Sequence, residues 1–146
     1  MKIETKNFGE IEFAEDGVIN FSEGIPGFRE LKRYIMINDE ESPFAYLQSI
    51  EDGNVSFIII NPYELKKDYT IEIKDQYVAA LGSGSAEQFS VFVITTLVSN
   101  LEAATVNLLA PIIIQNETRQ GMQVILENTK YTTRHKIVDL LAEGGC

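Results

Sequence analysis

The sequence predicts a mainly β protein, a compact antiparallel β-barrel or sandwich with one or two short helices packed outside. In several segments polar and apolar residues alternate with the period of two that is typical of strands. Turn residues interrupt the chain at short intervals, as at 51–54 and 116–121. Three further runs, at 34–37, 57–60 and 89–97, are apolar on both faces, which is typical of strands covered on both sides. With 146 residues and no linker, residues 1–146 are expected to form a single domain.

The N-terminal part begins with a strand pattern, because Ile11 and Phe13 alternate with Glu10 and Glu12. The next segment, "FSEGIPGF" at 21–28, carries two glycines and a proline. A phosphate-binding loop would need a Lys and a Ser or Thr after the second glycine, and none follows. The segment is therefore interpreted as a structural turn that two phenylalanines anchor to the core.

The central part predicts an antiparallel hairpin, in which residues 44–49 and 55–61 are joined by the turn sequence Glu51-Asp52-Gly53-Asn54. Pro62 suits the first position of a short helical turn over 62–65. Ile71 and Ile73 alternate with polar residues and predict another strand. A second short helical turn is expected around Val78 and Leu81, which precede Gly82.

The C-terminal part contains "TVNLLAPIIIQN" at 105–116. Asn107 interrupts an apolar strand, so it is either buried and hydrogen-bonded or exposed for recognition. Pro111 cannot donate to a ladder, which places it at an edge or at the break between two strands. A strand is expected at 122–126, and residues 131–141 fit a last strand followed by a short helix, although the periodicity does not decide between the two. The tail, 142–146, is expected to be frayed.

Charge and composition exclude several classes of function. The chain has 22 acidic and 12 basic residues, a net charge of −10, and 12 of the acids lie in residues 1–52. Direct binding of nucleic acid is not expected, because it requires Lys and Arg to neutralise phosphates. The acidic surface either attracts a basic protein partner or only maintains solubility. Since no apolar run reaches the roughly 20 residues of a membrane span and no signal peptide is apparent, we expect a cytoplasmic protein without a membrane contact.

The sequence offers no catalytic, cofactor-binding or metal-binding residues, and we expect the protein not to be an enzyme. His135 has no second histidine nearby with which to share a metal, and the single Cys146 leaves no intramolecular disulfide. The acids at 39–41 and 51–52 stand beside turn residues and flank the 44–49 strand. If both of its ends reach one face, Phe44, Tyr46 and Gln48 would lie between acidic borders and suit a protein partner.

Two other functions are compatible with such a fold. A barrel that holds a small apolar ligand would need a deep interior cavity. A hydrolase would need two carboxylates with raised pKa values in one cleft, and the acids here lie in turn-like sequence.

Five segments in order resemble the flagellar assembly factor FliW family, over about residues 8–135. They read "FSEGIPGF", "PFAYLQSIED", "FIIINPYE", "VFVITTL" and "TVNLLAPIIIQNETRQGMQVIL" followed by "YTTRH".

The resemblance implies a β-barrel-like, non-enzymatic protein that exchanges partners. Proteins of this family bind newly made flagellin in the cytoplasm and alternatively bind the RNA-binding regulator CsrA, which relieves repression of flagellin translation. The family motifs imply a contact surface with acidic neighbours at Glu23, Glu51 and Asp52. The contact residues that they imply are Phe44, Tyr46, Gln48, Asn61, Pro62, Asn107 and Pro111.

Overall fold

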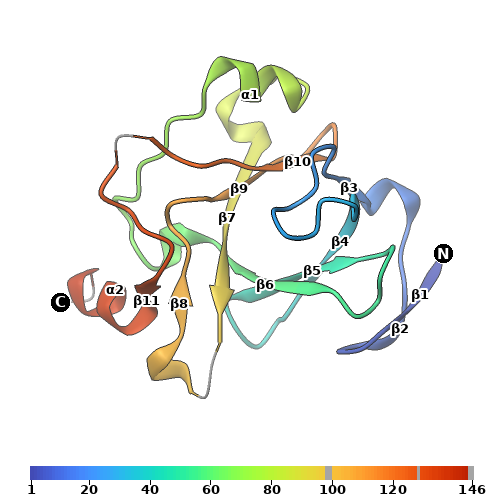
Figure 1. Ribbon diagram of the computed structural model, residues 1–146, viewed down its shortest axis with the longest axis horizontal. Helices are drawn as coiled ribbons and strands as arrows, with labels where there is room; N and C mark the ends of the chain where they lie inside the picture. The colour runs from blue at the N-terminus through green and yellow to red at the C-terminus, as the bar shows by residue number, and fades with distance from the viewer. Residues whose placement is uncertain (98–99, 128, 145–146) are drawn as a thin grey trace.

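Seven strands close into a β-barrel in the computed structural model, which describes residues 1–97, 100–127 and 129–144 (Figure 1). Around the barrel the order is β3, β4, β5, β6, β7, β9 and β10, and β10 returns to β3. Their bounds are β3 Ile19–Asn20, β4 Arg33–Asn38, β5 Phe44–Ser49, β6 Ser56–Ile60, β7 Phe89–Thr96, β9 Ile112–Gln115 and β10 Gln120–Gln123. Neighbouring strands are antiparallel except β10 and β3, which pair in parallel through Gln120 and Asn20. The predicted mainly β barrel and the predicted 44–49/55–61 hairpin are confirmed.

Side chains fill the interior of the barrel. Because successive residues of a strand point to opposite faces, Ala45 and Leu47 of β5 face inward while Phe44 and Tyr46 face outward. Phe21 and Tyr34 meet edge to face inside, with ring centroids 5.3 Å apart. Eight of the interior side chains are at most 1% exposed: Ile19, Phe21, Ile25, Tyr34, Leu47, Ile59, Ile112 and Ile114. These side chains occupy the space in which a barrel for a small apolar ligand would need its cavity.

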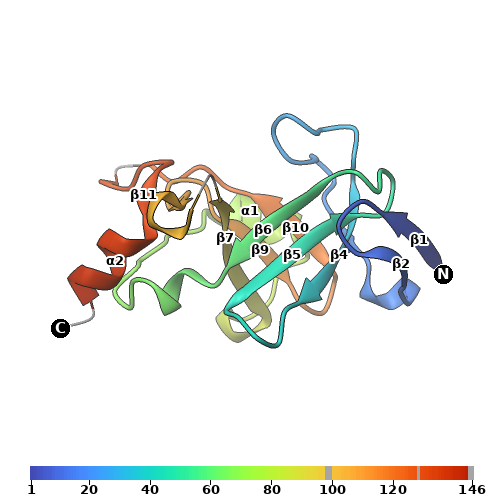
Figure 2. The same ribbon diagram turned by 90° about the horizontal axis from the view of Figure 1, so that it is seen from below.

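Short helices and a small sheet extension cover the outside of the barrel (Figures 1 and 2). They are η2 (Pro62–Glu64), α1 (Asp75–Ala80), η3 (Ala86–Gln88), η4 (Leu101–Ala103) and α2 (Ile137–Gly144), with strands β8 (Thr105–Val106) and β11 (His135–Lys136). One outer core packs Val93 of β7 and Leu108 against Leu140 of α2. Another packs Leu81 beside α1 against Ile113 of β9. Both predicted helical turns are confirmed, and residues 131–141 contain a two-residue strand followed by a helix.

A separate hairpin of β1 (Lys2–Thr5) and β2 (Gly9–Glu12) lies at one side of the barrel, as Figures 1 and 2 both show. Its turn rests on the β5–β6 hairpin, where the backbone N–H of Lys6 donates to the Gly53 carbonyl at 3.0 Å. Phe8 packs on Tyr46 with ring centroids 5.0 Å apart. The chain's own N-terminus thus covers part of the outer face of β5, at Tyr46.

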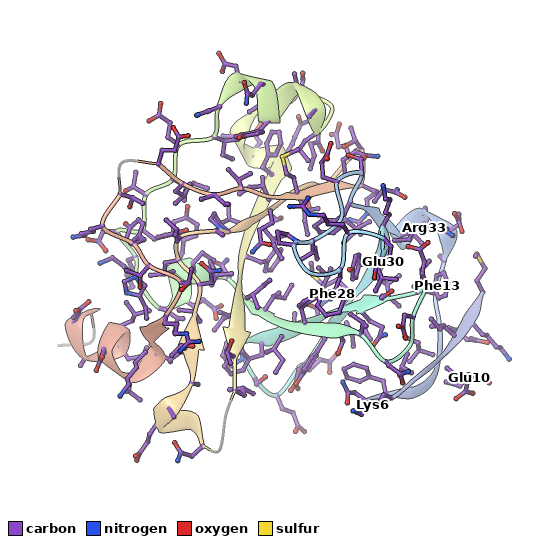
Figure 3. The ribbon with its side chains drawn as sticks, viewed as in Figure 1. Lys6, Glu10, Phe13, Phe28, Glu30 and Arg33 are labelled. Carbon is purple, nitrogen blue, oxygen red and sulfur yellow. The ribbon has the colours of Figure 1, made fainter. Side chains whose placement is uncertain are left out.

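The segment at 21–28 is a turn, as predicted. Gly24 and Gly27 have φ values of 68° and 90°, in the left-handed region that glycine tolerates. A β-carbon on Gly24 would also overlap the backbone of Arg29. Phe21 is fully buried, and Phe28 (Figure 3) packs edge to face on Phe57 at 5.4 Å. The two phenylalanines anchor the turn, as expected from the sequence.

The predicted strand around Ile71 and Ile73 is wrong. The segment 70–74 is extended, and both isoleucines pack partly against the outer core with Leu81. However, no backbone hydrogen bond joins the N–H groups of residues 71–73 to the described part of the chain. Alternation in the sequence indicates that one face of a segment is buried, and it does not show that the backbone has a neighbour to pair with.

The frayed tail predicted at 142–146 is also different in the structure. Residues 142–144 belong to α2, whose Leu140 is buried and anchors the helix to the barrel. Residues 145 and 146, including Cys146, lie outside the described residues.

Gly53 is required by the contact between the N-terminal hairpin and the β5–β6 turn. A β-carbon at this position would overlap the carbonyl oxygen of Glu4. We expect Gly53→Ala to lower the free energy of unfolding by about 2 kcal/mol, because one of two backbone segments must move. Gly17→Ala is the matched control, since its β-carbon would meet nothing within 4 Å. Equal unfolding midpoints in urea for both variants would contradict this assignment.

His135 links β11 to the loop before it. Its Nε2 accepts a hydrogen bond from the backbone N–H of Thr132 at 2.8 Å, which requires a neutral imidazole. The ring also packs against Tyr131, with centroids 6.2 Å apart. Burial lowers the pKa of His135 below its usual value.

This lowered pKa predicts a pH dependence of stability. The unfolded state, with a pKa of about 6.5, binds the proton more readily than the folded state, so stability is lost as pH falls through that range. Glutamine accepts the same hydrogen bond at every pH. We therefore expect the melting temperature to fall more for the wild type than for His135→Gln between pH 7.5 and 5.5. Parallel curves would show that His135 does not contribute.

Candidate partner-binding surface

The outer face of β5 was predicted to carry a contact surface, and the structure leaves only part of it open. Phe44 packs partly against the outer core that contains Ile60 and Val93. Tyr46 is partly covered by Phe8. Gln48 is completely buried, and its Nε2 donates to the carbonyls of Ser49 at 2.9 Å and Val55 at 3.1 Å. Gln48 therefore holds the β5–β6 hairpin together and is not available to a partner.

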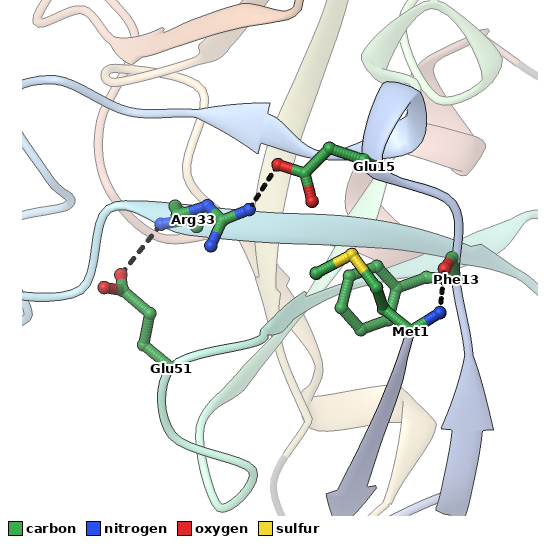
Figure 4. Close-up of polar contacts among 5 residues, drawn as sticks. All are labelled: Met1, Phe13, Glu15, Arg33 and Glu51. Atoms are coloured by element: carbon green, nitrogen blue, oxygen red, sulfur yellow. Dashed lines mark hydrogen bonds and ion pairs between the residues drawn. The ribbon is translucent and has the colours of Figure 1, made fainter.

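The two predicted acidic neighbours that follow β5 have local structural roles. The Glu51 carboxylate accepts from the backbone N–H of Lys32 and, at 3.0 Å, from that of Arg33 at the start of β4 (Figure 4). Asp52 accepts from the Asn54 N–H at 3.0 Å inside the turn. In the same region the Arg33 side chain pairs with Glu15 at 2.7 Å. The carboxylate of Glu51 thus ties the β5–β6 turn to β4.

Asn61, Pro62, Asn107 and Pro111 also stabilise the fold. Asn61 is the N-cap of η2, where its Oδ1 accepts from the Tyr63 N–H at 2.9 Å, and Pro62 is buried behind it. Asn107 uses its Oδ1 to accept from the N–H groups of Leu109 and Ala110 at 3.1 and 3.0 Å. Of the two predicted alternatives for Asn107, the structure supports the hydrogen bonds of the first, although the residue is half-buried and not fully buried. Pro111 is buried at the break before β9, as its missing N–H suggested.

The structure divides most of the predicted contact residues into two groups at opposite ends of β5. Phe44 and Asn61 lie at one end, because Phe44 pairs with Ile60, the residue before Asn61. Glu51 and the exposed Glu23 mark the other, since Lys32 contacts both Glu51 and the carbonyl of Ser22. Five residue steps along a strand separate the ends by about 17 Å. A partner that touches both groups must span the whole strand.

An apolar groove that sequence reasoning missed lies over β7, on the outside of the barrel. Its volume is about 400 Å³. The unpaired segment 70–74 forms one wall with Ile71 and Ile73, and Phe89 and Val91 of β7 form its base. Tyr63 and Val78 complete the apolar lining, and Tyr63 is 37% exposed. The alternation of Ile71 and Ile73 was the available signal, although it was interpreted as a strand.

The charged residues in the sequence around this groove are mainly acidic. Between residues 61 and 91, Lys66 pairs with Asp68 at 3.1 Å and Lys74 pairs with Glu127 at 3.0 Å. Within the described residues, one base of the same stretch, Lys67, forms no ion pair, against four acids: Glu64, Glu72, Asp75 and Glu87. An apolar groove within an acidic stretch suits a partner that combines apolar and basic side chains.

The described residues contain no group of three or more His, Cys, Asp or Glu side chains that could hold a metal ion. No helix within residues 1–97, 100–127 and 129–144 is long and apolar enough to cross a bilayer. The two acidic side chains of the β5–β6 turn, Glu51 and Asp52, accept hydrogen bonds from backbone N–H groups. These interactions hold turns in place and do not form a catalytic carboxylate pair.

Comparison with known proteins identifies the family. A family model described as "FliW protein" matches residues 2–137. The chain belongs to the FliW family. The flagellar assembly factor FliW of Clostridium novyi is 44% identical over 138 residues, which cover 94% of this chain and 96% of the relative. That of Caldanaerobacter subterraneus is 43% identical over 143 residues, covering 97% and 95%.

A solved structure supports the same assignment. The crystal structure of a flagellar assembly factor FliW matches with a TM-score of 0.89 and 36% sequence identity, over 94% of this chain and 96% of that chain. The resemblance seen in the five sequence segments is confirmed, and so is the fold. FliW proteins are flagellar assembly factors, and this chain shares their architecture over nearly its whole length.

For this FliW chain, we expect Glu51 to contribute to stability in a way that other surface acids do not. Glu51→Gln keeps an acceptor but loses the charge that strengthens two hydrogen bonds, and it should lower the free energy of unfolding by about 1 kcal/mol. Glu23→Gln removes an exposed carboxylate for which the structure shows no hydrogen bond or ion pair. It should unfold like the wild type in urea. If the two variants are equally stable, the hydrogen bonds between Glu51 and β4 do not contribute to the free energy of unfolding.

Proposed function

We propose that this flagellar assembly factor works without catalysis, by binding cytoplasmic flagellin and alternatively sequestering the translational regulator CsrA. In this exchange, free flagellin occupies the protein while CsrA represses flagellin translation. Export of flagellin frees the protein, which then captures CsrA, and translation resumes. If two ligands exclude one another on one protein, the concentration of each controls the occupancy by the other.

The apolar groove formed by Tyr63, Ile71, Ile73, Val78, Phe89 and Val91 is the observation that carries this proposal. Because the barrel interior is filled, binding must use the outer surface. An amphipathic segment of flagellin would place apolar side chains in such a groove. The net charge of −10 would attract an RNA-binding protein, which carries basic surface to hold its RNA.

Calorimetric titration tests the exchange. We expect the purified protein to bind flagellin and CsrA separately, and saturation with one to weaken the apparent affinity for the other. If the two ligands bind together with unchanged affinities, the exchange is refuted. If neither gives heat and neither co-elutes with the protein, the choice of partners is wrong.

Two variants connect the exchange to the groove. Ile73→Asp places a charge in the groove and should weaken binding of flagellin by about tenfold, because an unpaired carboxylate is costly in an apolar contact. Val138→Asp is the matched control, since Val138 is exposed on α2 and does not line the groove. Circular dichroism shows whether both variants remain folded. If both variants bind flagellin with equal affinity, the groove is not the binding site.

A further inference from the structure

A second groove, of about 580 Å³, lies between the N-terminal hairpin and β4. Its apolar lining comes from Ile11 and Phe13 on the hairpin side and from Ile35 and Ile37 on β4. Arg119, from the turn between β9 and β10, adds a guanidinium to this lining. The groove therefore combines an apolar wall with two charged side chains, Arg119 and Glu12.

One edge of β4 is open along this groove. On that side β3 pairs only with Arg33 and Tyr34, so residues 35–38 have no neighbouring strand within the described chain. The backbone hydrogen bonds outside regular elements also include none to residues 35–38. Along its other edge the strand pairs with β5 through to Asn38. An extended peptide can add to such an open edge by main-chain hydrogen bonds.

Arg119 has an unusual environment. It has a φ of 58°, in the left-handed region that favours glycine or asparagine, although its side chain is long. Its Nη2 donates to the Gly17 carbonyl at 3.0 Å, and its Nε is buried without an acceptor among the described residues. The buried Nε cannot serve a ligand in the groove, but a guanidinium has five N–H donors, and its other Nη N–H groups can donate to a further acceptor.

Of the carboxylates near this groove, those of Glu12 and Glu15 are paired with other cations, whereas Asp16, beside Gly17, forms no ion pair within the described residues. Glu12 lines the groove but lies 3.6 Å from the Lys2 ammonium. Glu15 pairs with Arg33 at 2.7 Å. Arg119 forms no ion pair with any described residue, although acids outnumber bases in the chain. A carboxylate from another molecule would therefore complement this arginine.

The open edge is also short. A chain that pairs with residues 35–38 and continues toward Tyr34 meets the edge already occupied by β3. Gly17, whose carbonyl accepts from Arg119, lies just before β3 in the sequence, so Arg119 is near this end of the open edge. A paired strand must therefore turn away or end there, and at its end a free carboxylate would meet Arg119.

We propose that this groove binds the C-terminal end of a partner polypeptide. The bound segment is extended and adds to the edge of β4 through its backbone. Its terminal carboxylate is held by Arg119, and its last side chain is apolar and packs against the apolar lining of the groove. The proposal is independent of the partner exchange described above.

Fluorescence anisotropy with defined peptides tests the site. The probes are four hexapeptides, labelled at the N-terminus, with alternating Thr and Val and ending in Leu, Val, Ile or Phe. We expect at least one to bind as the free acid, and its C-terminal amide to bind about tenfold more weakly. A peptide with N-methylated backbone amides should also lose binding, because it cannot pair with β4.

Variants of the arginine separate binding from a structural role. Arg119→Asn suits the left-handed turn and removes the charge, so it should abolish the preference for the acid over the amide. Arg119→Lys retains the charge and should preserve part of that preference. Arg134→Asn makes the same change at an exposed position outside the groove and should bind like the wild type.

Several results would overturn the proposal. They are no binding of any free-acid peptide up to 1 mM, equal binding of acid and amide, or an unchanged preference in Arg119→Asn. Tighter binding of hexanoate than of any peptide would assign the groove to small carboxylates instead. If Arg119→Asn loses its acid preference while circular dichroism and melting temperature stay unchanged, a purely structural role for Arg119 is excluded.

Discussion

The rest of the structure depends on the pairing of β7 with two neighbours. Its first half, from Phe89 to Phe92, pairs with β9, and residues 93–95 pair with β6. Without this double pairing the sheet would stay open, and the interior aromatic and branched side chains would face water. Burying large aliphatic and aromatic side chains is the main favourable term in folding, so the closed ladder and the filled interior stabilise each other.

A filled barrel leaves the outer surface for interactions, and many polar groups there already serve the fold. Glu51, Asn61 and Asn107 each satisfy backbone N–H groups that would otherwise lack partners at strand and helix ends. Such side chains can look like a binding surface in the sequence, because polar residues that interrupt apolar runs are typical of both roles. The two grooves differ from them, since they expose apolar side chains whose contacts are incomplete.

Much of the fold could be predicted because its signals are local. The turn at 51–54 determines the β5–β6 hairpin, and the glycines at 24 and 27 permit the tight turn before β4. The alternation of Ile71 and Ile73 correctly indicated that one face of this segment is buried, but the predicted strand was wrong. Strand pairing depends on which distant segment of the chain lies beside it. For the same reason the sequence did not reveal the groove beside Arg119. Gln48 was missed for a local reason, because its side chain turns back to donate to carbonyls of its own hairpin.

The parallel pair of Asn20 and Gln120 that closes the barrel also has a consequence for synthesis on the ribosome. β3 is made before β4, β5 and β6, but its partner in β10, Gln120, follows Asn20 only 100 residues later. At a translation rate of roughly 5–20 residues per second, β3 waits about 5–20 s for its second neighbour. During that time β4, β5 and β6 can form a sheet whose inner face, with Leu47 and Ile59, is still exposed. The nascent chain is therefore most vulnerable to aggregation before residue 120 emerges, because the barrel cannot close until then.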